Sequence, residues 1–314
     1  MRLRIACSPA GIDLLRSPWE RLYFPDRHTV FQSFAWNRLA AEAFADRERP
    51  YVVYAENATG AAIIPAAVTA SGITLLGETL FDYRDVLVAG DGGALSAAWR
   101  ELAALELPFS VAGLRGAADE WRAFDLRPFS EAPFVPAQDI QEHAAHSRAG
   151  RLVRRLERLD AGFRRYDGSS AALLRSIYRR KAVQFGAENL FTDPRRVDFM
   201  VRVLALAPAA VDVFTFETAG EIIAALVTLR DGSVRRFYTT WFDNAWAHQS
   251  PGTALLFEVT SQSLAEGLDC DYMTGAQPHK LRFRTASLPL FRAKASAEQL
   301  ARIASEQAEM KLAA

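Results

Sequence analysis

The spacing of apolar positions divides the first part of the chain into short strands and helices. Residues 2–7 alternate as in a half-buried strand, and residues 11–23 and 33–44 carry apolar side chains at helical spacing. The elements expected after these are strands at 51–56, 61–68 and 73–76, a helix at 94–105 and a strand at 109–112. Residues 129–136 contain Pro133 and Pro136, which is typical of a linker, so we place a domain boundary near residue 140.

The second part of the chain has a clearer pattern. The expected elements are a helix at 147–159, a strand at 163–166, helices at 169–185 and 194–206, strands at 211–217, 222–230 and 234–241, a loop at 243–250, a helix at 251–266, strands at 270–274 and 288–292, and a helix at 297–311. Ala219-Gly220 and Asp231-Gly232 join the three consecutive strands and are hairpin turn signals. The helix at 251–266 has Leu256, Val259, Thr260, Ser263 and Leu264 on one face.

Charge and cysteine content narrow the class of protein. The chain has 37 basic and 37 acidic residues, so its net charge is zero, which argues against DNA as a partner. Only Lys181, Lys280, Lys294 and Lys311 are lysines, so 33 of the 37 basic residues are arginines, a bias that suggests codon usage rather than function. Two cysteines outside a CxxC pair cannot form a disulfide framework. With no apolar run near the roughly 20 residues of a membrane span, we expect a soluble, cytoplasmic protein.

The most informative stretch begins the helix at 251–266. Ser250 is a good N-cap residue, and Pro251 is suited to the first helical position. Gly252 and Thr253 follow, and a glycine lets a ligand approach the backbone closely. Free N–H groups at such a helix start bind phosphate, although the same residues also make an ordinary, well-capped helix.

Three further groups of residues invite a functional interpretation. Arginines at 148, 151, 154, 155 and 158 form one face of a helix, with Leu152, Leu156 and Leu159 on the other. This helix suits an anionic ligand or a membrane surface, and it equally suits a solvated face. Lys280 follows Gly275 and is either a point charge for a phosphate or carboxylate, or a surface lysine. Asp82 and Asp85 flank Tyr83, either in a ligand cleft or in a plain turn.

The order of elements in the second half resembles the GNAT acyltransferase fold, and the first half repeats it less completely. Two such units in one chain resemble the tandem FemAB-like transferases. The ordered motifs further resemble the BioF2-like (CelD-type) acyltransferases associated with cellulose biosynthesis. The matching residues are Phe31-Gln32-Ser33, Trp36, Asp82-Tyr83, Asp85, the arginine run at 148–158, Tyr238, Asp243, Ser250-Pro251-Gly252, Asp271, Gly275 and Lys280. The chain departs from this pattern at His279, where the family has a tyrosine, and in a shortened phosphate loop at 249–254.

This resemblance implies an α/β fold with two tandem GNAT-like domains, whose mixed, mostly antiparallel sheets are flanked by helices. Residues 1–140 would form a degenerate first domain, and residues 141–314 the acyltransferase domain. A ligand cleft is expected on the second domain and between the two.

The resemblance also implies a reaction and its residues. An acyl group would pass from acyl-CoA, or another acyl thioester, to an amine or hydroxyl of a small molecule, saccharide or peptide, in polysaccharide or envelope biosynthesis. Asp243 would be the catalytic base, and Tyr238 would protonate the leaving thiolate or position the substrate. The residues expected to bind CoA are Gln249, Ser250, Gly252 and Thr253, and those expected to contact substrate are Lys280, Arg151, Arg155, Asp82, Tyr83 and Asp271.

Two other functions stay open at this point. One is a FemAB-like transferase that uses aminoacyl-tRNA, which the arginine run suits and the neutral net charge disfavours. The other is a non-catalytic scaffold or regulator that kept the fold. No metal is expected, because His143 and His146 lack a third ligand nearby in the sequence.

Overall fold

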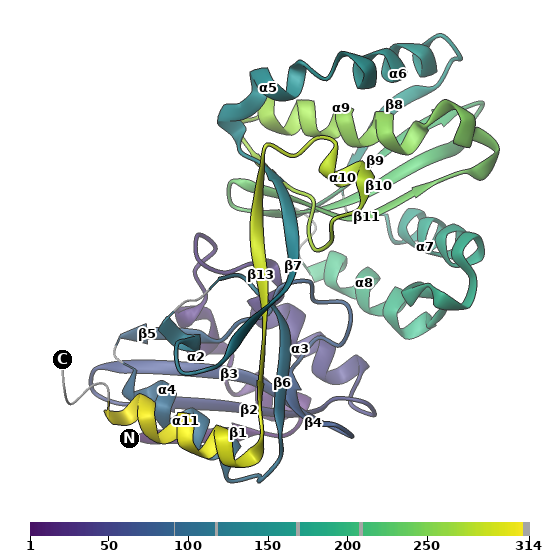
Figure 1. Ribbon diagram of the computed structural model, residues 1–314. Helices are drawn as coiled ribbons and strands as arrows, with labels where there is room; N and C mark the ends of the chain where they lie inside the picture. Colours follow the sequence, from purple (N-terminus) through teal and green to yellow (C-terminus); the bar gives the residue numbers. More distant parts are fainter. Residues whose placement is uncertain (91, 117–118, 168–169, 207–209, 310–314) are drawn as a thin grey trace. The chain divides into compact units, whose positions relative to one another are not determined.

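The chain forms two compact units. The computed structural model describes residues 1–90, 92–116, 119–167, 170–206 and 210–309 (Figure 1). Unit 1 is Met1–Ser130 together with the chain from Pro289 onwards, and unit 2 is Glu131–Leu288. The dividing points lie inside two strands, β7 (Leu126–Val135) and β13 (Ala286–Ala295). The end of the chain therefore returns to unit 1, which differs from the expected division into 1–140 and 141–314.

Unit 1 is a sheet with helices on both faces. Besides its parts of β7 and β13, its elements are β1 (Arg2–Ala6), α1 (Pro9–Asp13), α2 (Arg16–Leu22), η1 (Val30–Gln32), α3 (Phe34–Ala43), β2 (Arg49–Glu56), β3 (Gly60–Thr69), β4 (Gly72–Leu75), β5 (Leu87–Gly90), α4 (Gly93–Ala103), β6 (Phe109–Leu114), η2 (Asp119–Trp121) and α11 (Ala297–Glu309). The sheet order is β1-β2-β3-β4-β6-β13, with β5 also paired to β3. The pair β4–β6 is parallel and the others are antiparallel.

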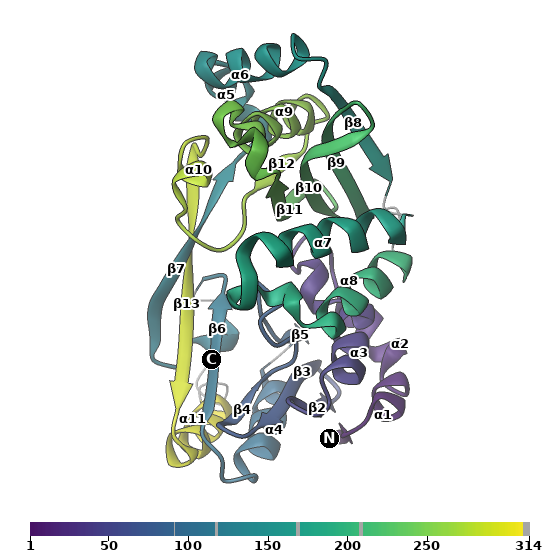
Figure 2. The same ribbon diagram turned by 90° about the vertical axis from the view of Figure 1, so that its right-hand side faces the viewer.

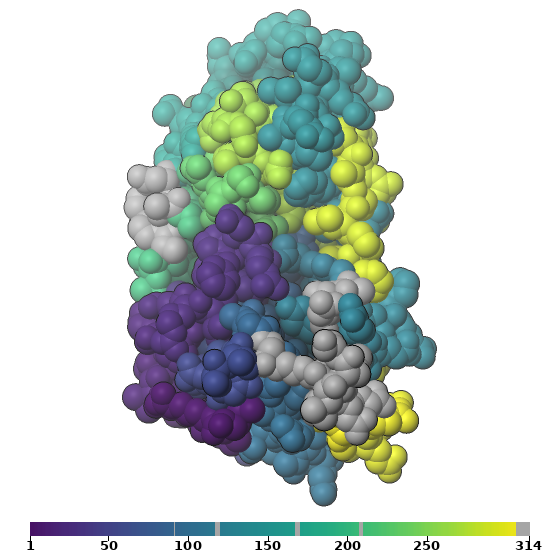
Figure 3. All heavy atoms as spheres, turned by 90° about the vertical axis from the view of Figure 1, so that its left-hand side faces the viewer, coloured from purple at the N-terminus to yellow at the C-terminus, as the bar shows by residue number. Residues whose placement is uncertain are grey.

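The core of unit 1 follows the alternation of its strands. Val53 packs with α4 and α11 in one apolar cluster, which includes Trp99 and Leu300. Its neighbour Val52 packs on the opposite face, in the cluster that includes Trp19. Successive side chains of a strand point to opposite faces, so a strand buried on both sides is apolar throughout. At the edge of the sheet, β1 buries only its last residue, and its atoms (dark purple) lie at the surface in Figure 3.

Unit 2 has the same layered plan. Its elements are η3 (Ala137–Asp139), α5 (Ile140–Ala144), α6 (Ser147–Glu157), β8 (Gly162–Asp167), α7 (Ala171–Phe185), η4 (Gly186–Glu188), η5 (Leu190–Thr192), α8 (Pro194–Leu206), β9 (Val211–Thr218), β10 (Glu221–Asp231), β11 (Val234–Phe242), η7 (Asn244–Gln249), α9 (Pro251–Ala265), β12 (Asp269–Asp271) and α10 (Pro278–Leu281). The helix α9 covers one face of the sheet, with α5 and α6 packed on it, and α7 and α8 cover the other (Figures 1 and 2). The five residues of α9 that were expected to share one face are all buried.

The sheets of the two units have the same pattern of strand directions. Unit 2 runs β8-β9-β10-β11-β12-β7, and only β11–β12 is parallel. Unit 1 runs β1-β2-β3-β4-β6-β13, and only β4–β6 is parallel. In each unit a helix, α4 or α9, lies in the chain between the two parallel strands. The expected tandem organisation is therefore confirmed. The last strand of each unit is exchanged: β13, near the end of the chain, completes the sheet of unit 1, and β7, from the first half of the chain, completes that of unit 2.

This exchange explains where the expected elements differ from the structure. Of the residues expected as a linker at 129–136, all but Pro136 belong to β7, and the carbonyl of its Pro133 accepts from the Tyr272 N–H at 2.9 Å. A proline lacks an N–H but keeps its carbonyl as an acceptor, so it still contributes this bond to the ladder. Ser169, expected to open a helix, lies outside the described residues, and Ser170 caps α7 instead.

Both hairpin turns are confirmed. Ala219 and Gly220 both have positive φ, 49° and 80°, between the antiparallel strands β9 and β10. Gly232, φ 52°, turns the chain from β10 to β11. In the described part of the chain, no helix has the length and apolar character needed to cross a membrane.

The return of the chain to unit 1 can be tested with a single substitution in α11. Leu300 is fully buried in the cluster that contains Trp99. Leu300→Ala should lower the free energy of unfolding by about 2–5 kcal/mol, because it removes buried methyl groups and leaves a cavity. Urea unfolding followed by tryptophan fluorescence measures this loss. The exposed Glu298→Gln is the control and should stay within about 0.5 kcal/mol of wild type. An equally small effect of Leu300→Ala would show that α11 is not part of the core.

Candidate active site

The parallel strands β11 and β12 pair over a short distance and then part. Their register has three pairs, and the last places Arg236 opposite Asp271. β11 continues to Phe242, whereas the chain after Asp271 turns to β7. There the Tyr272 N–H donates to the Pro133 carbonyl at 2.9 Å, and the Gly275 N–H to the Glu131 carbonyl at 2.8 Å. A wedge between two strands therefore opens on the sheet of unit 2, at their carboxyl ends, where ligands bind in α/β sheets.

A β-bulge lies on β11 where the wedge begins. Val227 lies opposite Thr239, and the next residue of β10, Thr228, lies opposite Phe237. Tyr238 is therefore the extra residue of the bulge, and its side chain is half-buried. A bulge bends its strand and turns part of the backbone away from the ladder, and it is common beside active sites. The sequence predicted a role for Tyr238 but gave no sign of the bulge.

A buried ion cluster holds the base of the wedge. Arg236 donates through Nε to Asp231 at 2.5 Å and through a terminal nitrogen to Asp271. Asp271 is fully buried and also accepts from the Met273 N–H at 2.7 Å. Its carboxylate therefore holds β11 and β12 together, and a contact of Asp271 with substrate stays a prediction.

The start of α9 has an unusual cap. Ser250 occupies the cap position in the left-handed region, with φ 53° and ψ 49°, and its hydroxyl makes no capping hydrogen bond. The Thr253 and Ala254 N–H groups both donate to the Ser250 carbonyl at 3.1 Å. Among the described residues, no acceptor is found for the Gly252 N–H. The first turn of α9 therefore keeps a backbone donor for a ligand.

Two residues at this helix start, Gln249 and Gly252, bear on ligand binding. The amide oxygen Oε1 of Gln249 is buried, and the described residues provide no hydrogen-bond donor for it. A buried polar atom without a partner costs free energy unless a ligand or water supplies one, so it fits a binding site. The glycine at position 252 also has a packing reason, because a Cβ there would lie 3.1 Å from the Phe242 ring.

Asp243, the expected catalytic base, lies at the end of β11. Its carboxylate accepts from the Ala245 N–H at 2.9 Å and so caps the short helix η7. Its own N–H donates to the Ile223 carbonyl at 2.9 Å. The structure gives Asp243 a local role in ordering η7, which leads directly to Ser250.

Two lysines flank the wedge. Lys280, on the short helix α10, donates to the Thr274 carbonyl at 2.7 Å. Lys181, on α7, donates to the Thr240 carbonyl of β11 at 3.1 Å. Burial, and to a smaller degree the charge of Lys280, lower the pKa of the Lys181 ammonium to about 8. The sequence pointed to Lys280 but not to Lys181, for which the one available signal was the scarcity of lysine.

The arginine helix is α6, and its charged face is exposed. Arg151 and Arg155 are both exposed, whereas Ala149, Val153 and Leu156 are buried against α9. The helix also packs against η7, beside the start of α9. Leu159 was expected on the leucine face of this helix, but α6 ends before it and its side chain is 41% exposed.

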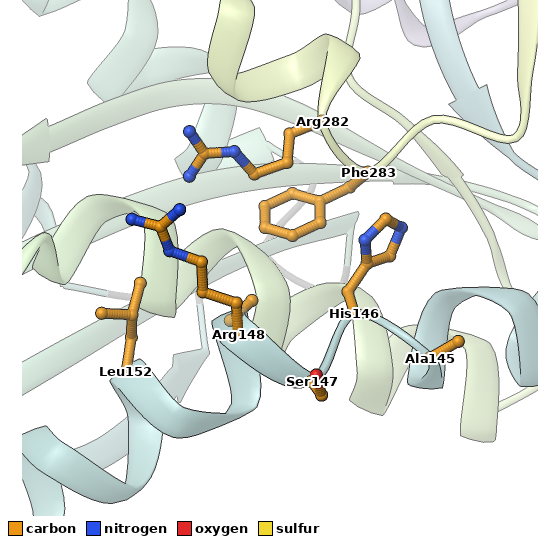
Figure 4. A pocket seen from close by; sticks show the side chains of 8 residues that line it. Ala145, His146, Ser147, Arg148, Leu152, Arg282 and Phe283 are labelled. Atoms are coloured by element: carbon orange, nitrogen blue, oxygen red, sulfur yellow. The ribbon is translucent and has the colours of Figure 1, made fainter.

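A pocket of about 370 Å³ lies at the other end of α6. Arg148 and Arg282 extend to the same side of it, beside the ring of Phe283 (Figure 4). Phe283 packs on Phe257, which lies well inside α9 rather than at its start. None of the residues predicted to be catalytic or to bind CoA lines this pocket.

The two motifs of unit 1 meet in its interior. The amide of Gln32 donates to the Tyr83 carbonyl at 2.9 Å, and the Tyr83 ring packs on Phe31. Tyr83 is fully buried and packs in the interior of unit 1, and its expected contact with substrate stays a prediction. Asp82 is half-buried, and its carbonyl closely faces Gly113. These motifs therefore maintain unit 1.

Comparisons with known proteins agree with this geometry. Residues 144–281 match the acetyltransferase (GNAT) domain model. FemX has 10% identity and a TM-score of 0.56 over 97% of this chain and 100% of its own. A tandem GNAT protein from the clavulanic acid biosynthesis pathway has 11% identity and a TM-score of 0.54, with 94% and 99% covered. The C-terminal domain of a putative lysylphosphatidylglycerol synthetase from Agrobacterium fabrum has 11% identity and a TM-score of 0.57, with 85% and 93% covered. No curated protein matches the sequence.

The chain therefore has the GNAT acyltransferase fold in two tandem units. The family model covers most of unit 2, which carries the wedge, the bulge and the start of α9. At identities near one in ten, the solved structures show the fold alone. The narrower BioF2-like (CelD-type) resemblance stays a prediction.

The electrostatic coupling of the two lysines gives a testable shift. Lys280→Met removes a positive charge near Lys181, so the pKa of Lys181 should rise above about 8 while staying below its ordinary value, since burial persists. An NMR titration of lysine side-chain carbons measures it. Lys294→Met, at an exposed position of β13, is the control and should leave the pKa of Lys181 unchanged. No rise in Lys280→Met would mean that the two ammonium groups do not face one another.

Proposed function

We propose that the protein transfers an acyl group from acyl-CoA, or a related acyl thioester, to an amine or hydroxyl acceptor. The observation that carries this proposal is the wedge between β11 and β12, with a bulge on one arm. The chain then leads from the end of β11 through η7 to the start of α9. The wedge, the bulge and this helix start all belong to unit 2, where the GNAT domain model matches.

The start of α9 would hold the phosphates of CoA. The Gly252 N–H and the positive end of the helix dipole suit an anion. The buried Gln249 oxygen is an acceptor, so it suits an N–H or O–H donor elsewhere on the ligand. Ser250 and Thr253 border this position with hydroxyl groups. Bound acyl-CoA would supply the activated thioester, and the protein would orient it and place polar groups around it.

The bulge would act on the reacting carbonyl. Backbone N–H groups aimed at a developing oxyanion stabilise it strongly, since they are already oriented before the reaction. We assign this role to the backbone around Tyr238, because the bulge turns part of it from the ladder. The Tyr238 hydroxyl would protonate the leaving thiolate or position substrate, and a water chain would take the proton of the attacking amine or hydroxyl. Asp243 would serve by ordering η7.

The phosphate position can be tested by placing a charge at the third residue of α9. Thr253→Asp should lower the affinity for CoA at least ten-fold, because a carboxylate there repels a phosphate. An acid in the first turn of a helix is otherwise favourable, so the fold should be as stable as wild type. Isothermal titration with CoA measures the affinity.

Thr253→Asn is the matched control for this test. It has the shape of the aspartate without its charge and should keep CoA affinity within about three-fold of wild type. Equal affinity in Thr253→Asp and Thr253→Asn would refute a phosphate at this helix start. This pair is preferable to a substitution at Gly252, where any side chain would press on Phe242.

The arginine helix gives a second test. Arg151 and Arg155 are exposed on a helix that packs beside η7. If they attract the phosphates, Arg151→Gln with Arg155→Gln should weaken CoA binding and flatten its dependence on salt. The control is Arg148→Gln, because Arg148 lines the pocket at the other end of α6. This variant should change neither the CoA affinity nor its salt dependence. An unaltered salt dependence in the double variant would leave α6 as a solvated face.

A FemAB-like transferase that uses aminoacyl-tRNA is the second candidate. The exposed arginines of α6 are the observation that favours it. Thermal shift with CoA, acyl-CoA and tRNA distinguishes the two, because a ligand that binds the folded state raises its melting temperature. No shift with any of them would favour a non-catalytic role.

A further inference from the structure

The pocket at the N-terminal end of α6 has a basic lining. Arg148, on α6, and Arg282, which follows α10, extend to the same side of it (Figure 4). Ser147 and His146 add a hydroxyl and an imidazole, and the other lining side chains are alanine, leucine and phenylalanine, so none of the described lining residues is acidic. Its volume of about 370 Å³ is in the range of cavities that hold small organic ligands.

The two guanidinium groups are not engaged within the protein. Within the residues that the structure describes, the side chains of Arg148 and Arg282 make no hydrogen bond and no ion pair, and the Ser147 hydroxyl has no partner either. By contrast, Arg284, two residues further along the chain, donates to Glu131 at 2.6 Å. Two positive charges at one pocket repel one another, and a bound anion would remove this repulsion.

The fold fixes the backbone that carries both arginines. Ala149 and Phe283, the residues that directly follow them in the chain, are buried in one apolar cluster of unit 2. The Phe283 ring packs on Phe257 of α9, with ring centroids 5.9 Å apart, and meets the edge of His146 at 5.4 Å. The base of the pocket is therefore a packed aromatic group, and only the two arginine side chains need to adjust to a ligand, which limits the entropy cost of binding.

We propose that this pocket binds the phosphate monoester group of a small molecule. A guanidinium donates two parallel N–H groups to two oxygens of one anion. One such fork already engages both oxygens of a carboxylate, whereas a phosphate monoester offers three terminal oxygens and a charge of about −1.5 to −2 at pH 7, enough for two forks. The Ser147 hydroxyl is a further donor at this pocket. The site does not depend on the proposed acyl transfer.

Calorimetric titration of the full chain with glycerol 3-phosphate, at constant ionic strength, tests the site. Arg148→Gln and Arg282→Gln should each weaken binding by about ten-fold or more, because each removes charge-assisted hydrogen bonds. Both positions are exposed, so the variants should melt near wild type. Arg282→Lys should restore only part of the affinity, because an ammonium keeps the charge without the fork. The matched control is Arg155→Gln, which removes an exposed charge from the other end of α6 and should keep the affinity within about two-fold.

The chemistry of the anion is tested with two other probes. Glycerate, which carries a carboxylate instead of the phosphate, should bind about ten-fold more weakly than glycerol 3-phosphate. Vesicles of phosphatidylcholine with phosphatidic acid present the same phosphate group on a lipid surface. Equal or tighter binding of glycerate, or binding to the vesicles without binding of glycerol 3-phosphate, would overturn the proposal. Equal losses of affinity in Arg148→Gln and Arg155→Gln would also overturn it, because they would show a general effect of charge.

The start of α9 is the other position where a phosphate could bind, and two variants separate it from the pocket. Thr253→Asp should leave the affinity for glycerol 3-phosphate unchanged, and Arg148→Gln should leave that for CoA unchanged. The opposite result, in which Thr253→Asp loses glycerol 3-phosphate and Arg148→Gln keeps it, would place the phosphate at α9 and reject the pocket. A protein that binds glycerol 3-phosphate through both arginines but does not bind CoA would keep this site and reject the proposed acyl transfer from CoA.

Discussion

A buried arginine joins β10, β11 and β12 at the point where the last two strands part. Arg236 is 5% exposed and binds both Asp231 and Asp271, which are buried with it. Removing one member of such a cluster would leave an unpaired buried charge, which costs about 3–5 kcal/mol. The cluster therefore fixes the last register pair of the parallel strands, and with it the origin of the wedge. The bulge at Tyr238 follows two residues later on the same strand.

Three features of unit 2 take their positions from this junction. The backbone around Tyr238 belongs to one arm, and Thr274, whose carbonyl binds Lys280, belongs to the other. The end of β11 leads through η7 to a helix start that has a left-handed serine cap and an unpartnered glutamine oxygen among the described residues. We assign the thioester to the bulge and the phosphates to the helix start. Each assignment uses groups that the fold already orients, so little entropy is lost when substrates bind.

Local patterns in the sequence were sufficient for much of this fold. Helical spacing predicted α9 and its buried face, and Ala219-Gly220 predicted the hairpin between β9 and β10. The return of β13 to unit 1 could not be predicted, because strand exchange depends on pairing between distant segments and leaves no local pattern. The same holds for the site. Motifs pointed to Tyr238 and Lys280, but the bulge and Lys181 became visible only when β10, β11 and α7 were placed together. For Asp271 and Tyr83, the family resemblance implied contact with substrate, and the structure adds that both side chains are fully buried, which no local pattern showed.

The central claim is that CoA phosphates bind at the first turn of α9. Its most direct test is the amide NMR spectrum of protein labelled with ¹⁵N-glycine, which holds signals from at most 18 residues. Because an N–H that gains a phosphate acceptor changes its shielding strongly, the Gly252 signal should show the largest shift on addition of CoA. That shift should saturate with the affinity found by calorimetry. Saturable CoA binding that leaves the Gly252 signal in place would contradict the account, as would the absence of CoA binding.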